Sequence, residues 1–306
     1  MIQFIIRRLL QTIPVFFGVT ILVFLLLHIT PGDPAVIIAG EGAPEQTINN
    51  IREKLGLNDP IYVQYFKFLS NILQGDLGNS IRSNQPVIDE IGARFWTTVE
   101  LAFYSIILAV FIGLIAGIIS AVKQYSLIDS LVMIVALFGL SMPNFWLGLM
   151  LMKWFALDIP IFEPSGWGSW EQNVLPVLTL GTGGAAIIAR MTRSSMLEVI
   201  NQDYIRTARS KGVKERIVIY KHALKNALIP VVTVVGLEFG GFLGGAVLTE
   251  SVFAVNGMGL LVVNAIRARD FPVVQGTVLV IALIFVLVNL IVDISYRYLN
   301  KRIDLQ

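Results

Sequence analysis

The residues that could carry chemistry are few and far apart in this chain. It contains no cysteine and only two histidines, His28 and His222, so disulfides, thiolate chemistry and a histidine metal site are disfavoured. The sequence has no phosphate loop ending in Gly-Lys-Ser/Thr, no His-Glu-x-x-His motif and no Gly-x-Ser-x-Gly elbow. We therefore predict no catalytic residues, no metal site and no cofactor bound by this chain itself.

The composition indicates a membrane protein. Of 306 residues, 55% are hydrophobic and 14% are charged, whereas a soluble domain carries about 25% charged residues. Mean hydropathy is +0.74. The net charge of +2 is too small to indicate a nucleic-acid partner.

Six apolar runs are long enough to cross a bilayer, because a spanning helix needs about 20 apolar residues. The predicted spans are Leu9–Ile29, Thr97–Ala121, Leu127–Phe155, Val174–Arg190, Ile229–Leu248 and Val273–Ile294. The first run lacks a small-residue cleavage site, which favours a retained span over a signal peptide. The predicted fold class is an all-α polytopic membrane protein with six transmembrane helices in contact with lipid.

Lysine and arginine orient the chain, because short loops rich in these residues stay on the cytoplasmic side. They gather at Arg7 and Arg8, between residues 190 and 225, and in the tail after residue 296. We therefore expect both termini in the cytoplasm. The predicted organisation is residues 1–29 as N-terminus and first span, 30–96 as an extracytoplasmic helical loop, and 97–306 as a core with a cytoplasmic loop at 191–228.

Turn residues divide the outer loop into helices. Helices are predicted from Pro44 to Gly56, from Ile61 to Gly75, and from Pro86 into the second span. The loop is either a cap that packs on the bundle or a seat for a substrate-delivery protein. A further short helix is predicted at Leu260–Ala268.

A few polar residues fall inside apolar runs. Ser141 and Asn144 flank Pro143, a break that is tolerated only where protein or a water-filled cavity satisfies the backbone. Glu238 is a carboxylate within a predicted span, where it usually faces a cavity or a partner. These three residues are candidates for a translocation path, and a packed kink and a structural hydrogen bond are the alternatives.

Glycines cluster on the predicted spans. Gly240, Gly241, Gly244 and Gly245 remove side chains from the fifth span, which predicts close contact with a neighbouring helix or a second subunit. Gly113 and Gly117 allow similarly close packing of the second span. 

The most ordered polar stretch is the basic segment Asp203–Gly212. Leu197, Ile200, Tyr204 and Ala208 share one face of a predicted helix, which Asn201 or Asp203 could cap and Gly212 could end in a left-handed turn. A second helical pattern follows through Ile217 and Leu224, and Pro230 is predicted to open the fifth span. Such helices lie on the membrane or their own bundle, or dock into a soluble partner.

This segment resembles the cytoplasmic loop of permease subunits from bacterial ABC importers. That loop reads Glu-Ala-Ala, three residues, Gly, and then a hydrophobic stretch that ends in Leu-Pro. Here Arg206-Thr207-Ala208 stands for Glu-Ala-Ala, and Gly212 follows at the expected distance. Lys225 replaces the usual proline, and Ile229-Pro230 comes later, which is similar to the longer form of the dipeptide/oligopeptide/nickel branch. Other stretches that resemble this branch are Pro31-Gly32-Asp33-Pro34, Gly75-Asp76-Leu77-Gly78, Arg190-Met191-Thr192-Arg193 and Asn226-Ala227-Leu228-Ile229-Pro230.

The resemblance implies the rest of an importer. It implies a type I ABC-importer permease fold in the bacterial inner membrane. The implied partners are a second homologous permease subunit, two ATPase subunits that bind ATP and Mg²⁺, and an extracytoplasmic solute-binding protein. The implied substrate is a short peptide, with nickel chelates, glutathione or another small solute as alternatives. A stand-alone secondary transporter is the competing class, although we find no inverted repeat. The residues implied to couple to the ATPase are Asp203, Tyr204, Arg206, Thr207, Ala208, Arg209, Lys211 and Gly212.

Overall fold

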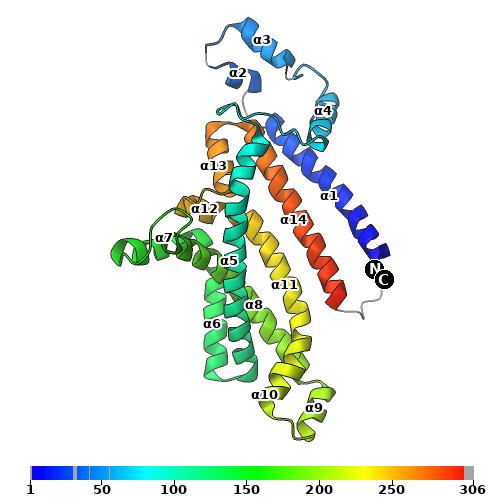
Figure 1. The fold of residues 1–306 in the computed structure, drawn as a ribbon, viewed down its shortest axis with the longest axis vertical. Helices are drawn as coiled ribbons and strands as arrows, with labels where there is room; N and C mark the ends of the chain where they lie inside the picture. The colour runs from blue at the N-terminus through cyan, green and yellow to red at the C-terminus, as the bar shows by residue number, and fades with distance from the viewer. Residues whose placement is uncertain (1, 30–32, 41, 55, 300–306) are drawn as a thin grey trace. The chain divides into compact units, whose positions relative to one another are not determined.

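The computed structural model describes residues 2–29, 33–40, 42–54 and 56–299, and the regular elements in these ranges are helices (Figure 1). Pro31-Gly32 and the tail residues Lys301 and Arg302 lie outside the described residues. The helices are α1 Ile2–Ile29, α2 Pro34–Ala39, α3 Glu45–Lys54, α4 Ile61–Leu73, α5 Val87–Val122, α6 Leu127–Ser141, α7 Asn144–Met152, α8 Trp170–Ile200, α9 Asp203–Ser210, α10 Glu215–Ile217, α11 Leu224–Gly245, α12 Val247–Phe253, α13 Met258–Ala268 and α14 Phe271–Leu299. Two π-helical turns, η1 Lys153–Asp158 and η2 Val218–Ala223, precede the loop before α8 and the start of α11.

The chain forms two compact units. The first comprises the residues up to Trp96 together with Gly257–Leu283, and the second comprises Thr97–Asn256 together with the residues from Ile284 onward. Each unit is therefore discontinuous in sequence.

Aromatic side chains hold α4 against α1 in the first unit. Phe24 packs on Tyr65 and Phe68, with ring centroids 5.5 and 5.7 Å apart. The Thr20 hydroxyl lies 3.0 Å from the Tyr65 hydroxyl. The predicted helices of the outer segment are confirmed as α3, α4 and the start of α5, and Gly75 after α4 has φ +81°.

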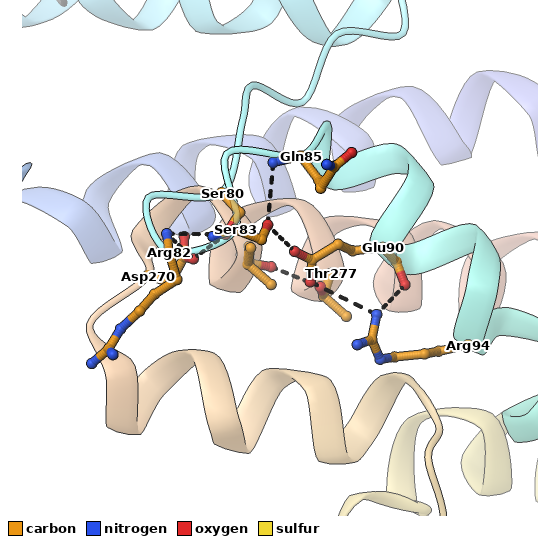
Figure 2. A network of polar contacts seen from close by, with 9 residues as sticks. Ser80, Arg82, Ser83, Gln85, Glu90, Arg94, Asp270 and Thr277 are labelled. Carbon is orange, nitrogen blue, oxygen red and sulfur yellow. Dashed lines mark hydrogen bonds and ion pairs between the residues drawn. The ribbon is translucent and has the colours of Figure 1, made fainter.

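A buried carboxylate organises the polar end of this unit. Asp270, only 3% exposed, accepts hydrogen bonds from the Ser80 hydroxyl at 2.5 Å and from the Ile81 and Arg82 amides at 3.2 and 3.3 Å. Figure 2 shows the Arg82 side chain pointing away from this network. The loop that carries Ser80 is thereby fixed to the corner between α13 and α14, because a buried carboxylate needs such donors.

Helix α8 lies at the centre of the second unit and packs against α6, α7 and α11 (Figure 1). Its close contact with α5 depends on glycine: a Cβ at Gly113 would meet Ile188 at 2.7 Å, and one at Gly117 would meet the Ala189 carbonyl at 2.5 Å. The predicted close packing of these two glycines is therefore confirmed. Leu101, Leu180 and other buried apolar residues fill the space between α5, α8 and α11.

The break at Pro143 is confirmed, but Leu127–Phe155 is not one straight span. Helix α6 ends at Ser141, Met142 is extended at ψ 129°, and α7 leaves at 99° to α6. The cause is Pro143, which lacks an amide proton and disfavours helical geometry in the residue before it.

Two other predicted boundaries are wrong. Helix α8 does not end at Arg190 but continues to Ile200, because no glycine or proline interrupts residues 191–200. Pro230 does not open a helix but lies inside α11, which follows η2 without a break. Pro230 costs this helix one backbone hydrogen-bond donor.

Five described helices are long and apolar enough to cross a membrane, and two bent pairs of shorter helices raise the number to as many as seven. The predicted helix Leu260–Ala268 is confirmed as part of α13, whereas α12 was not expected. The fifth apolar run was predicted to continue to Leu248, but α11 ends at Gly245 and a separate helix, α12, starts at Val247.

Candidate functional site

The candidate site is α9, Asp203–Ser210, and the turn that follows it (Figure 1). Gln202, extended at ψ 150°, precedes the helix, and no side chain caps its first turn. The predicted cap by Asn201 or Asp203 is therefore wrong. Asn201 instead ends α8, and its amide donates to the Leu197 carbonyl at 2.9 Å. Asp203 lies in the first turn, where the helix dipole favours an acidic side chain.

One isoleucine fixes α9 to the unit. Ile205 is 0% exposed and packs in a cluster with Met196 of α8, Val218 of η2 and Ile118 of α5. The prediction that Leu197, Ile200, Tyr204 and Ala208 lie on one helix is wrong, because α8 ends at Ile200 and α9 starts at Asp203, but Leu197 and Ile200 do pack on this cluster. Ala208 does pack on the cluster, while Tyr204 is 42% exposed.

The left-handed turn predicted at Gly212 is confirmed. Gly212 has φ +74°, its amide donates to the Arg209 carbonyl at 2.9 Å, and the Val213 amide donates to the Ala208 carbonyl at 3.3 Å. A Cβ at this position would meet no atom within 4 Å. The glycine is thus needed for its backbone conformation and not for space.

Two polar contacts hold the ends of the segment. The Arg209 guanidinium donates to both carboxylate oxygens of Glu215, at 2.7 and 3.1 Å, and this hydrogen bonding raises the pKa of Arg209. The Asn226 amide donates to the Tyr204 hydroxyl at 2.7 Å. Glu215 and Asn226 were not predicted as partners of Arg209 and Tyr204, because these contacts depend on how the chain folds and not on residue spacing.

The opposite face of α9 is exposed and basic. Arg206 and Lys211 are exposed, and the Arg206 guanidinium lies 3.9 Å from the exposed Asp203 carboxylate. The Thr207 hydroxyl donates to the Asp203 carbonyl at 3.0 Å. The segment therefore presents cations and a few polar groups on a short helix whose other face is anchored.

The other predicted site residues lie on different elements. The Ser141 hydroxyl, exposed at the end of α6, donates to the Leu137 carbonyl at 2.9 Å. Asn144, at the start of α7, and Glu238, on α11, are half-buried. The described contacts bring Ser141 and Asn144 to the two sides of one break, and they give no contact between either of them and Glu238.

The four predicted packing glycines of α11 differ in exposure: Gly240 is buried, whereas Gly241 and Gly245 are exposed. A Cβ at Gly240 would make ordinary contact with Phe285 at 3.4 Å, and a Cβ at Gly241 or Gly245 would meet nothing within 4 Å. Gly244 is half-buried. The tightest approach on α11 is at Gly236, where a Cβ would lie 2.2 Å from a Val292 methyl group.

Comparison with known proteins identifies the family. The model described as "Binding-protein-dependent transport system inner membrane component" matches residues 113–305, and its N-terminal companion matches residues 1–102. The chain belongs to this permease family. It is thus a membrane-spanning subunit of an ABC importer and not an enzyme.

Relatives of similar length support this assignment. The dipeptide transport system permease protein DppB of Alkalihalophilus pseudofirmus is 47% identical over 99% of both chains. The glutathione transport system permease protein GsiC of Escherichia coli K12 is 46% identical, again over 99% of both chains. The permease family is therefore matched from end to end.

A solved structure supports the permease fold. A chain from an inward-facing crystal structure of the MetNI methionine ABC transporter aligns with a TM-score of 0.60 at 22% identity. The alignment covers 70% of this chain and 97% of that chain. The helices in the described residues of this permease thus share the fold of that transporter chain.

Proposed function

We propose that this permease carries short peptides across the bacterial cytoplasmic membrane after a solute-binding protein delivers them. The relatives named for dipeptide and glutathione transport support this choice, because glutathione is itself a short peptide. ATP and Mg²⁺ are bound by two partner ATPase subunits, since the chain has no phosphate loop. A second, homologous permease completes the membrane part.

The proposed coupling element is α9. The observation that carries this proposal is that Ile205 anchors the helix on one face while its other face is exposed and carries charged and polar side chains, among them Arg206. Such a helix inserts into a groove of the ATPase subunit and moves with it, because a helix anchored in a packed cluster transmits a displacement as a rigid piece. The coupling residues are Asp203, Tyr204, Arg206, Thr207, Ala208, Arg209, Lys211 and Gly212.

The proposed topology has six spans and both termini in the cytoplasm. The spans are α1, α5, the bent pair of α6 and α7, α8, α11 and α14, with residues 30–96 outside and α9 inside. This division keeps 1–29, 30–96 and 97–306 as the functional parts, with coupling residues within 191–228. The distribution of lysine and arginine supports this orientation.

The remaining site residues are proposed to serve the path and the subunit contact. Ser141, Asn144 and Glu238 face the translocation path, because polar groups at membrane depth line cavities. Of the four glycines of α11, the exposed Gly241 and Gly245 receive a helix of the second permease, Gly244 lies half-buried beside them, and Gly240 serves close packing within this chain.

The natural absence of cysteine makes the topology directly testable. Arg206→Cys should react with a membrane-impermeant maleimide only from the cytoplasmic side, and the matched control Ser83→Cys only from the outer side. In the assembled complex, Arg206→Cys should also form a cross-link to an ATPase subunit. Reaction of Arg206→Cys from outside intact cells would refute the proposed orientation and the coupling role together.

The turn at Gly212 gives a second test of coupling. Gly212→Val should abolish substrate-stimulated ATP hydrolysis in the assembled complex, because a β-branched residue disfavours a φ of +74°. Gly212→Asn should retain much of it, since asparagine tolerates this conformation and the site has space. If Gly212→Val retained as much substrate-stimulated ATP hydrolysis as Gly212→Asn, coupling would not require a rigid turn at this position.

The substrate is tested on the solute-binding protein. Calorimetric titration with a dipeptide, with glutathione and with a nickel–histidine chelate should show binding of a peptide and not of the nickel chelate. Uptake driven by an ion gradient, without ATP, in vesicles that hold this chain alone would instead establish a secondary transporter.

A further inference from the structure

An ion pair between a buried carboxylate and a partly exposed guanidinium joins the turn between α5 and α6 to α8. Asp129 is 4% exposed, and its two carboxylate oxygens accept hydrogen bonds from Nε and Nη2 of Arg193, each at 2.7 Å. The same carboxylate accepts from the Tyr125 amide at 2.9 Å and from the Ser120 hydroxyl. This parallel two-bond geometry fixes the direction as well as the distance between the two side chains.

The turn is shaped around this carboxylate. Tyr125 has φ +61°, a left-handed conformation that is uncommon for a residue other than glycine, and it donates its amide to Asp129. Ser126 caps α6 by accepting from the Asp129 amide at 3.3 Å. The start of α6 is thus defined by Asp129, and Asp129 is in turn held by α8 through Arg193.

The ion pair lies next to the cluster that anchors α9. Ser120 stands between the cluster residues Ile118 and Ala121 on α5, and Arg193 is one helical turn before Met196 on α8. A displacement of Ile205 therefore reaches the ends of both helices that touch the Asp129 carboxylate, because a closely packed cluster moves as a unit.

Helix α6 continues from this ion pair to the break in the chain. It packs along α8 and ends at Ser141, two residues before Pro143 and three before Asn144. Both ends of α6 thus have a defined partner or role: Asp129 at its first turn and the candidate path residues at its last.

We propose that Asp129 and Arg193 are positioning residues that transmit the movement of α9 through α6 to the break at Pro143. This inference rests on the proposed function, in which α9 is moved by the ATPase. If the pair is intact, α6 follows α8 when the ATPase subunits close. If the pair is lost, α9 still binds the ATPase but the break no longer responds.

The test measures the break itself and needs no substrate. Ser141→Cys is introduced into the cysteine-free chain, and its rate of reaction with a small maleimide is measured in the reconstituted complex without nucleotide and after trapping with ADP and vanadate. We expect the rate to change on trapping in the otherwise unaltered complex. We expect it to become independent of trapping in Asp129→Asn, in Arg193→Gln and in the double variant.

The double variant separates transmission from stability. A single change leaves one buried charge without its partner, whereas the double change removes both charges, so its melting temperature should lie above those of the single variants. If the response at position 141 returns together with the melting temperature, the pair is merely structural and the proposal is overturned. Should a single variant fail to assemble, Arg193→Lys retains the charge without the two-bond geometry and should weaken the response.

Further measurements keep this inference apart from the proposed function. The cross-link of Arg206→Cys to the ATPase should persist in all of these variants, and its absence in the unaltered complex would refute the proposed function. Two outcomes overturn the inference alone. In the first, Asp129→Asn keeps the cross-link, and its reaction rate at position 141 still changes on trapping as in the unaltered complex. In the second, trapping does not change this rate even in the unaltered complex. Asp158→Asn breaks the exposed Lys153–Asp158 pair and is the matched control, which should leave the response intact.

Discussion

Replacing Ile205 by alanine should release α9 from the rest of the permease. Helix α9 has eight residues, and isolated helices shorter than about 12–15 residues are marginal in water, so its order depends on docking. Ile205 is 0% exposed, and removing such a side chain to alanine costs about 2–5 kcal/mol. The Tyr204–Asn226 hydrogen bond contributes only about 0.5–1.5 kcal/mol, and the exposed Arg209–Glu215 pair less than about 1 kcal/mol.

The hydrophobic contact therefore decides whether α9 stays in place. At about 1.4 kcal/mol for each factor of ten, the loss predicts about 30-fold to 4,000-fold more frequent opening of α9. Hydrogen exchange of the amides at 203–210, measured by mass spectrometry on the reconstituted complex, should rise accordingly. Substrate-stimulated ATP hydrolysis should fall with it, because a detached helix cannot transmit a displacement.

A matched isoleucine in the same segment serves as the control. Ile217 is 44% exposed, so Ile217→Ala should leave exchange at 203–210 close to that of the unaltered chain. Ile205→Val, which costs about 0.5–1.5 kcal/mol, should lie between the two. Unchanged protection of α9 in Ile205→Ala would refute the claim that this side chain anchors the helix.

Three further outcomes are expected. Gly236→Ala should lower the melting temperature of the purified permease, because the new Cβ would lie 2.2 Å from a Val292 methyl group, whereas Gly241→Ala, with nothing within 4 Å, should not; equal losses would contradict this packing. Asp270→Asn should speed protease cleavage between residues 78 and 83, since an amide cannot accept all three hydrogen bonds equally well; unchanged cleavage would show that the loop does not need the carboxylate. The hydrogen bond from Arg52 lowers the pKa of Asp33. The stability that Asp33 gives to α2 should therefore be complete above the usual pKa of 3.8 and be lost as pH falls through the lowered value. In Arg52→Ala, the pKa of Asp33 measured by nuclear magnetic resonance titration should return toward 3.8.

The sequence predicted those features that depend on local backbone chemistry. Gly212 ends α9 and Pro143 breaks the third apolar run because each residue type favours one backbone conformation regardless of the surrounding fold. Residue spacing failed where the fold overrides it. Pro230 looked like the first residue of a helix but lies inside α11, because a proline costs one donor wherever it falls and packing can compensate.

The sequence predicted a short helix in the basic segment but missed the residue that anchors it. The basic segment was found from its charge, whereas Ile205 was missed because the apolar spacing was continued across Asn201, where α8 ends. Contacts between distant residues could not be predicted from spacing. Asp129 and Arg193 are 64 positions apart, and nothing in one sequence shows that they meet.

The bond between Ser80 and Asp270 joins residues 190 positions apart. During synthesis, Ser80 is made long before Asp270, and domains begin to fold from the N-terminal end. The loop around Ser80 must wait for the end of α13 before it acquires its final shape. A chain released before residue 270 has been made therefore lacks the carboxylate that fixes this loop.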